Sequence, residues 1–142
     1  MFPETPELSI SISAKTEMLK MVVELTKHIA VLNQFSIPDA EKISLAVDEA
    51  TTNVIAHSYK KREEETLRLE FFLDFTGIKI RIIFAGIPPQ LQENKVELSE
   101  MIKAKRKGGL GVKLMRSIMD SVEYKTEGSI NSCEMIKWKR EN

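Results

Sequence analysis

Two residues near the middle of the chain have the types and spacing that acid–base or phosphoryl-transfer chemistry needs. Glu49 and Asn53 stand four positions apart, so on a helix they share one stripe, which His57 would continue. The carboxylate could orient or deprotonate a nucleophile, and the carboxamide oxygen could bind a divalent cation beside phosphates. The same pair also occurs on solvated helix faces with a simple i,i+4 hydrogen bond, so it indicates a site only together with other signals.

A glycine-rich turn late in the chain is the second candidate. Its residues are Gly108, Gly109, Leu110 and Gly111, and the basic residues just before it are Lys105, Arg106 and Lys107. Glycines at the start of a helix let the backbone approach an anion, which the free N–H groups and the helix dipole then attract. Such a turn can equally serve as a hinge, and the adjacent basic residues favour the phosphate-binding interpretation.

The helix that carries Glu49 and Asn53 has clear start signals. Ser36 can accept a backbone N–H, and Pro38 falls in the first turn, where its missing donor costs little. The helix is predicted to run to about Tyr59. Its apolar stripe is Ile43, Val47, Ala50 and Val54, whereas Asp48, Thr51 and Thr52 are expected to point away from the candidate site.

The rest of the chain must supply the framework for these two elements. Residues 7–13 alternate as an edge strand does, and Ser13 is the expected N-cap of a helix that ends near Asn33. The apolar residues of that helix are Met18, Met21, Val22, Leu25, Ile29 and Leu32. Residues 66–75 and 78–84 predict an antiparallel hairpin that turns at positions 76–77.

The final third of the chain predicts a lid and a closing hairpin. Residues 90–108 are mostly polar and long for a connection, which favours a functional lid. Residues 121–126 and 130–138 read as two strands, with Val122, Tyr124, Ile136 and Trp138 available for the core. The order of elements predicts one α+β domain over residues 1–142, a two-layer sandwich of a largely antiparallel sheet with helices on one face.

Composition limits the classes of function. The chain has 142 residues with 21 basic and 21 acidic side chains, so its net charge gives no attraction to nucleic acid or an anionic membrane. The one basic cluster, residues 103–107, lacks interleaved aromatic residues, and no stretch reaches the roughly 20 apolar residues of a membrane span. Cys133 is the only cysteine and has no zinc-like spacing to His28 or His57, so a reduced cytoplasm is expected.

Two long motifs together resemble a known superfamily. Residues 45–59, LAVDEATTNVIAHSY, resemble the N box of the GHKL (Bergerat-fold) ATPases, which include gyrase, histidine kinases and mismatch-repair proteins. Residues 108–120, GGLGVKLMRSIMD, resemble a glycine box of the same superfamily. The resemblance covers the chain from about Leu8 to Trp138 and is closest to the anti-sigma factor serine/threonine kinases of bacterial partner-switching systems.

This resemblance implies a set of roles. ATP would lie between the sheet and the helices, with Glu49 as general base and Asn53 on Mg²⁺. The residues implied to bind the nucleotide are Asn53, Phe84, Gly86, Lys105, Arg106, Gly108, Gly109, Leu110 and Gly111. The implied partners are a sigma factor and an anti-anti-sigma (STAS-type) protein, whose serine would receive the γ-phosphoryl group. Dimerisation through the first strand and helix is a further expectation.

One position departs from the family pattern. A second glycine box, after the hairpin, normally begins with an aspartate that accepts a hydrogen bond from the adenine amino group, and Phe84 stands there instead, two residues before Gly86. Phe84 shares the inward parity of Ile82, so its ring is expected to project into the adenine space. Loss of a buried hydrogen-bond acceptor for adenine costs about 1–3 kcal/mol of binding free energy.

Two functions therefore remain open: a kinase with a weakened adenine site, or an inactive pseudo-ATPase that regulates by binding proteins. A histidine-kinase catalytic domain is disfavoured, because no segment remains for a helical hairpin that carries a phospho-accepting histidine.

Overall fold

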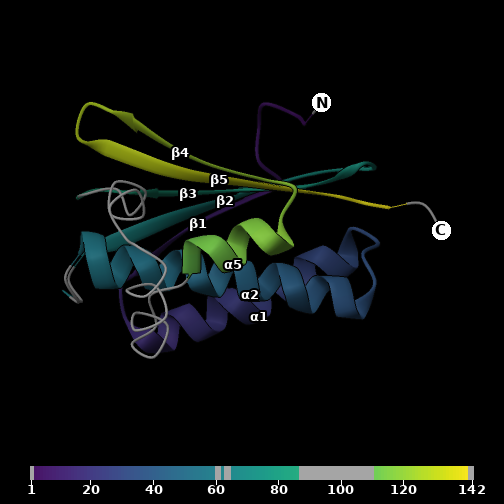
Figure 1. Ribbon diagram of the computed structural model, residues 1–142, viewed down its shortest axis with the longest axis horizontal. Helices are drawn as coiled ribbons and strands as arrows, with labels where there is room; N and C mark the ends of the chain where they lie inside the picture. Colours follow the sequence, from purple (N-terminus) through teal and green to yellow (C-terminus); the bar gives the residue numbers. More distant parts are fainter. Residues whose placement is uncertain (1, 60–61, 63–64, 87–110, 141–142) are drawn as a thin grey trace.

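The computed structural model describes residues 2–59, 62, 65–86 and 111–140. In chain order the elements are β1 (Leu8–Ser13), α1 (Thr16–Leu32), α2 (Ile37–Asn53), the π-helix η1 (Val54–Ser58), β2 (Thr66–Asp74), β3 (Gly77–Phe84), α5 (Gly111–Ile118), β4 (Ser121–Glu127) and β5 (Ile130–Trp138). The strands form one antiparallel sheet in the order β1-β2-β3-β5-β4. Helices α1, α2 and α5 cover one face of it (Figure 1). The predicted two-layer α+β sandwich is confirmed.

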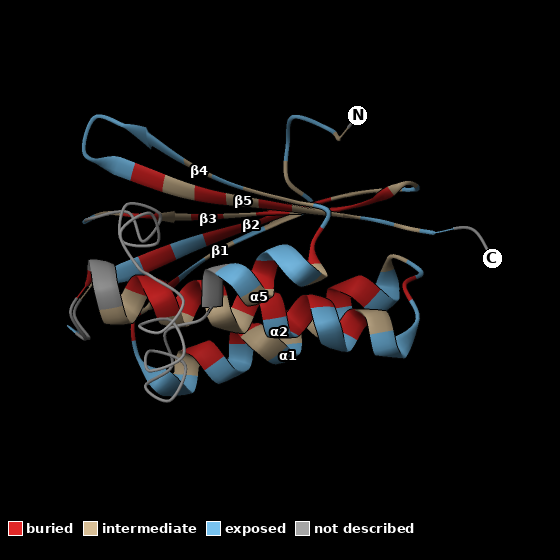
Figure 2. Cartoon of the chain, in the orientation of Figure 1, coloured by how far each residue is buried: buried red, intermediate tan, exposed pale blue. Residues whose placement is uncertain are grey.

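The core lies between the sheet and the helices, as Figure 2 shows. Its strand residues alternate as the sequence predicted and include Leu67, Leu69, Phe71, Ile78, Ile80 and Ile82, all at most 1% exposed. Phe75 does not continue the pattern, because β2 ends at Asp74 and the Phe75 ring is 87% exposed in the turn. Among the described residues, no helix combines the length and apolar character needed to cross a bilayer.

The start of α1 differs from the prediction. Ser13 was expected to cap this helix, but it pairs with Thr66 as the last residue of β1. The ladder continues for one more bond, because the Ala14 N–H donates to the Glu65 carbonyl at 2.9 Å. The N-cap is therefore Lys15, which makes no side-chain capping bond. Two of the expected core residues, Met21 and Leu32, are 45% and 73% exposed, whereas the predicted end near Asn33 is confirmed.

Helix α2 begins as predicted and ends in an unusual turn. The Asp39 N–H donates to Ser36 Oγ at 3.2 Å, which confirms the N-cap. Helical structure continues to Ser58, but from Val54 it widens into a π-helix, so the predicted length holds while the backbone geometry changes. Thr51, which was expected to point away from the candidate site, lies in the core. It is fully buried, and its hydroxyl donates to the Val47 carbonyl at 2.9 Å, which offsets the cost of burying it.

The direction of the side chains in β5 was predicted wrongly. Cys133 and Met135 face the helices, because they pair with Ile82 and Ile80 of β3. A shift of one residue moves every side chain of a strand to the other face. Trp138, expected in the core, therefore lies on the uncovered face, where it stacks on Phe2 with ring centroids 5.3 Å apart. Ile136, also expected in the core, pairs with Lys79 on that face. The partners expected from β4, Val122 and Tyr124, do pack against the core.

Candidate functional site

Three elements that carry predicted site residues begin or end toward the same end of the molecule. In Figure 1 the C-terminal part of α2, the last residues of β3 and the start of α5 all lie at the same end. Helix α2 packs between α1 and α5, so one flank of α2 faces α5. Gly111, the last glycine of the predicted phosphate-binding turn, is the first residue of α5. The fold thus brings the two motifs onto adjacent helices.

Glu49 and Asn53 lie one turn apart in the last part of α2. Asn53 is the final residue of the helix and is only 2% exposed, whereas Glu49 is partly buried. Burial raises the pKa of the Glu49 carboxyl above its usual value, and the negative charge of Asp48 raises it further. A carboxylate with a raised pKa is a better proton acceptor near neutral pH than an ordinary one. A buried carboxamide supplies a hard oxygen of the kind that Mg²⁺ prefers.

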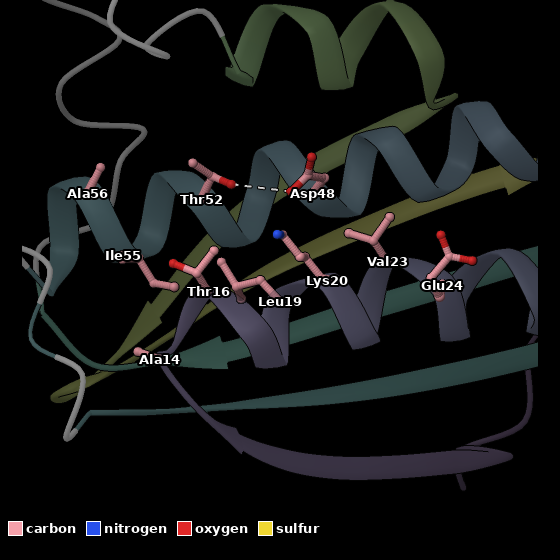
Figure 3. A pocket seen from close by; sticks show the side chains of 10 residues that line it. All are labelled: Ala14, Thr16, Leu19, Lys20, Val23, Glu24, Asp48, Thr52, Ile55 and Ala56. Carbon is pink, nitrogen blue, oxygen red and sulfur yellow. Dashed lines mark hydrogen bonds between the residues drawn. The ribbon is translucent and has the colours of Figure 1, made fainter.

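Asp48 belongs to a different surface from Glu49. With Thr52 it lines a pocket of about 740 Å³ between α1 and α2, whose other walls include Leu19, Lys20 and Val23 of α1 (Figure 3). The Thr52 hydroxyl donates to Asp48 Oδ1 at 3.4 Å. Consecutive residues point about 100° apart around a helix. Helix α2 therefore presents one acid to the groove with α1 and its neighbour to another surface.

Phe84 ends β3 on the helix-facing side of the sheet. It is 2% exposed, so the predicted inward parity is confirmed. Its partner in the ladder is Asn131, which is also 2% exposed. Gly86 follows with a φ of +94°, a conformation that glycine adopts without strain. A buried apolar ring thus stands at residue 84, where the resemblance implies an acceptor.

Sequence reasoning missed two polar residues beside Phe84. The Tyr59 hydroxyl accepts from the Ala85 N–H at 2.9 Å, and the Asn131 side-chain amide donates to the Gly86 carbonyl at 2.6 Å. Burial raises the pKa of Tyr59, so its hydroxyl stays protonated at neutral pH. Nothing in local spacing links Tyr59 to the β3 end, and Asn131 could have been found only from the correct parity of β5.

Part of the predicted site lies outside the described residues. These positions are Lys105, Arg106, Gly108, Gly109, Leu110 and the lid over residues 90–108. Their proposed contact with phosphates stays a prediction. The described residues include the flank of α2 and the beginning of α5, the helix that follows the glycine-rich turn.

Comparison with known proteins defines the class. The model of the histidine kinase-like ATPase domain family matches residues 12–137, which is nearly the whole chain. Two solved structures have the same fold at low sequence identity. A chain of the SiaB–SiaC complex from Pseudomonas aeruginosa aligns with a TM-score of 0.67 and 12% identity, covering 94% of this chain and 90% of that one. The RsbU and RsbW domains of Rv1364c from Mycobacterium tuberculosis align with a TM-score of 0.64 and 13% identity, covering 96% of this chain and 34% of that one.

Closer relatives narrow the class to a family. The serine-protein kinase RsbW of Halalkalibacterium halodurans is 32% identical over 133 residues, which are 90% of this chain and 80% of that protein. RsbW of Listeria monocytogenes is 28% identical over 86% of this chain and 82% of its own length. RsbW of Staphylococcus epidermidis is 36% identical over 72% of this chain and 68% of its own. The chain belongs to the anti-sigma factor serine/threonine kinase family of the GHKL ATPases.

Proposed function

We propose that this protein is a serine/threonine-protein kinase of the anti-sigma factor type, which uses Mg-ATP to phosphorylate a serine of an anti-anti-sigma partner. The observation that carries the proposal is the pairing of Glu49, whose pKa is raised, with the buried Asn53 one turn along α2, on a helix that packs against α5. Relatives at 28–36% identity are named serine-protein kinases, which supports the reaction class.

The residues at this end of the fold divide the work of a phosphoryl transfer. Glu49 would take the proton from the attacking serine hydroxyl as the serine oxygen bonds to the γ-phosphorus, the bond from that phosphorus to the β,γ-bridging oxygen breaks and ADP leaves. Asn53 would hold Mg²⁺. When bound, Mg-ATP would supply the phosphoryl group and part of the neutralising charge. Gly86 would line the base-binding end, and the backbone of Gly108, Gly109, Leu110 and Gly111, with Lys105 and Arg106, would hold the phosphates.

The proposed protein partners rest on the same family membership. The named RsbW relatives and the fold shared with a chain of the SiaB–SiaC complex support binding to an anti-anti-sigma protein. A sigma factor is the second proposed partner, and a homodimer through β1 and α1 remains part of the proposal. We place the protein in the cytoplasm, where the buried Cys133 thiol would stay reduced.

Phe84 favours a second candidate function. A ring that is 2% exposed and has no polar atom stands where the resemblance implies an adenine acceptor, so we propose that adenine binding is weakened. In the extreme case the protein would be a pseudo-ATPase that binds its partners without phosphorylating them. Micromolar affinity for Mg-ATP in a calorimetric titration would contradict the weakened site.

The two functions separate in a transfer assay with γ-labelled ATP and the cognate STAS-type partner. The kinase proposal expects label on the partner with the wild-type protein and none with Glu49→Gln. Glu41→Gln is the matched control, because it makes the same substitution on α2 at a carboxylate about two turns away, which pairs with Lys27 of α1. Equal loss of transfer in both variants would contradict the role of Glu49. Partner binding without any transfer by the wild type would support the pseudo-ATPase.

A further inference from the structure

The turn that follows β3 is held by a buried tyrosine from the end of the α2 helix. Tyr59 is 2% exposed, and its hydroxyl uses both of its hydrogen-bonding capacities. It donates to the Thr66 carbonyl at 2.6 Å and accepts from the Ala85 N–H at 2.9 Å. One side chain therefore ties the start of β2, the end of β3 and the end of η1 together.

The tie continues through the backbone to Asn53. The Tyr59 N–H donates to the Val54 carbonyl at 2.9 Å, which closes the π-helical turn that begins directly after Asn53. A π turn is wider than an α-helical turn, because its hydrogen bond spans one more residue. The hydrogen-bonded backbone of this turn therefore connects Asn53 directly to Tyr59.

A second buried side chain holds the same turn from the neighbouring strand. Asn131 is 2% exposed, and its Nδ2 donates to the Gly86 carbonyl at 2.6 Å. The amide is itself oriented, because Asn131 Oδ1 accepts from the Thr126 hydroxyl at 2.8 Å. Gly86, at a φ of +94°, is the residue of this turn with the greatest conformational freedom. The bond from Asn131 therefore removes motion where the backbone would otherwise move most easily.

We propose that Tyr59 and Asn131 are positioning residues, which together fix the turn at residues 84–86 relative to Asn53. The inference rests on the proposed function, in which this turn lines the base end of the nucleotide site and Asn53 holds the metal at the phosphate end. A fixed spacing between the two ends lowers the ordering cost of binding a ligand that spans both. Phe84 offers no hydrogen-bond acceptor to a base, and yet the turn is still held by Tyr59 and Asn131. Base binding would therefore depend on the shape of the turn.

An ordinary structural role would give a different pattern of effects. If the two bonds only stabilise the fold, their loss lowers the free energy of unfolding and leaves ligand selectivity unchanged. If they position the turn, their loss weakens ligands that carry a base and spares ligands that are phosphate alone. Thr51→Val supplies the matched control for Tyr59→Phe, because it also removes one buried hydroxyl, whose bond stays within α2 and does not reach the turn.

The test compares Mg-ATP with Mg-tripolyphosphate by isothermal titration, using wild type, Tyr59→Phe and Thr51→Val. We expect Tyr59→Phe to weaken Mg-ATP binding by about tenfold, the scale of one buried hydrogen bond, with little change for tripolyphosphate. Thr51→Val should leave both affinities unchanged. Asn131→Leu, which keeps a similar shape without polar atoms, should act like Tyr59→Phe. Equal weakening of both ligands by Tyr59→Phe, or no weakening of either, would overturn the proposal.

A second measurement needs no ligand and separates this inference from the proposed function. Amide hydrogen exchange at Ala85 should accelerate more in Tyr59→Phe than in Thr51→Val when the two are compared at equal global stability. Equal acceleration would refute the clamp. If the wild type binds neither ligand, the kinase proposal fails in favour of the pseudo-ATPase, and the positioning role in nucleotide binding fails with it. If it binds both and Tyr59→Phe behaves as wild type, only the positioning role fails.

Discussion

Replacing Phe84 by aspartate should restore an acceptor at the base end of the site and tighten Mg-ATP binding. The change has a large cost, because the ring is 2% exposed in the core between sheet and helices. Removing a buried phenylalanine side chain costs about 3–5 kcal/mol of stability in the Phe→Ala case. A buried, unpaired carboxylate adds to that cost. The variant will therefore be less stable than the wild type whether or not nucleotide binds.

The comparison that isolates the acceptor is Phe84→Asp against Phe84→Ala. Both variants open the space that the ring fills, and only one supplies an oxygen for the adenine amino group. A buried hydrogen bond of this kind is worth about 1–3 kcal/mol, so Phe84→Asp should bind Mg-ATP roughly 5- to 150-fold more tightly than Phe84→Ala. Mg-GTP should show no such gain, because guanine presents an acceptor where adenine presents a donor.

Calorimetric titration measures the affinities. Urea unfolding with and without Mg-ATP checks them, because a ligand that binds only the native state stabilises it by RT ln(1 + [L]/Kd). Indistinguishable affinities of the two variants for Mg-ATP would refute the placement of residue 84 beside adenine. A gain for Mg-GTP equal to that for Mg-ATP would refute the amino-group contact while leaving the cavity argument intact.

Three further predictions concern pH, reactivity and backbone. The raised pKa of Glu49 means that its ionised form is disfavoured in the folded state. Glu49→Gln should therefore be more stable than the wild type above the folded-state pKa, and this difference should vanish below the usual pKa of 4.5. Urea unfolding at several pH values tests this. Burial raises the pKa of Cys133 to about 12, so the thiol should resist aromatic disulfide reagents until the protein unfolds, and rapid labelling of the native protein would contradict this. Gly77→Ala would make a Cβ clash with the Lys137 carbonyl oxygen, which is backbone, and should cost about 3 kcal/mol or more of stability. Gly128→Ala meets open space at a φ of +64° and should cost only about 1 kcal/mol. Equal losses of stability in thermal melts would refute the close approach at Gly77.

Local signals explain what could be predicted from the sequence. The start of α2 depends on Ser36 and Pro38, which act within one turn, and the β2–β3 hairpin depends on alternation within each strand. The inward direction of Phe84 followed from the same alternation within β3. These features need no knowledge of distant residues.

What the sequence could not give depends on pairing between distant segments. The final strand has apolar residues on both parities, so only its register with β3 decides that Met135 faces the helices and Trp138 does not. Ser13 can cap a helix or extend a strand, and its pairing with Thr66 makes it the last residue of β1. The bond between Tyr59 and Ala85 joins residues whose local patterns are unrelated, and no spacing rule would have found it.

The place of β5 in the sheet has a consequence for synthesis. The last strand in sequence is inserted between β3 and β4, where Gly77 meets Trp138 and Phe84 meets Asn131. A nascent chain that has left the ribosome only as far as β3 would have that strand as an open, largely apolar edge, which is a ready template for mispairing. Completion of the sheet has to wait for translation of the C-terminal strand, and the slow step in folding should be this long-range closure.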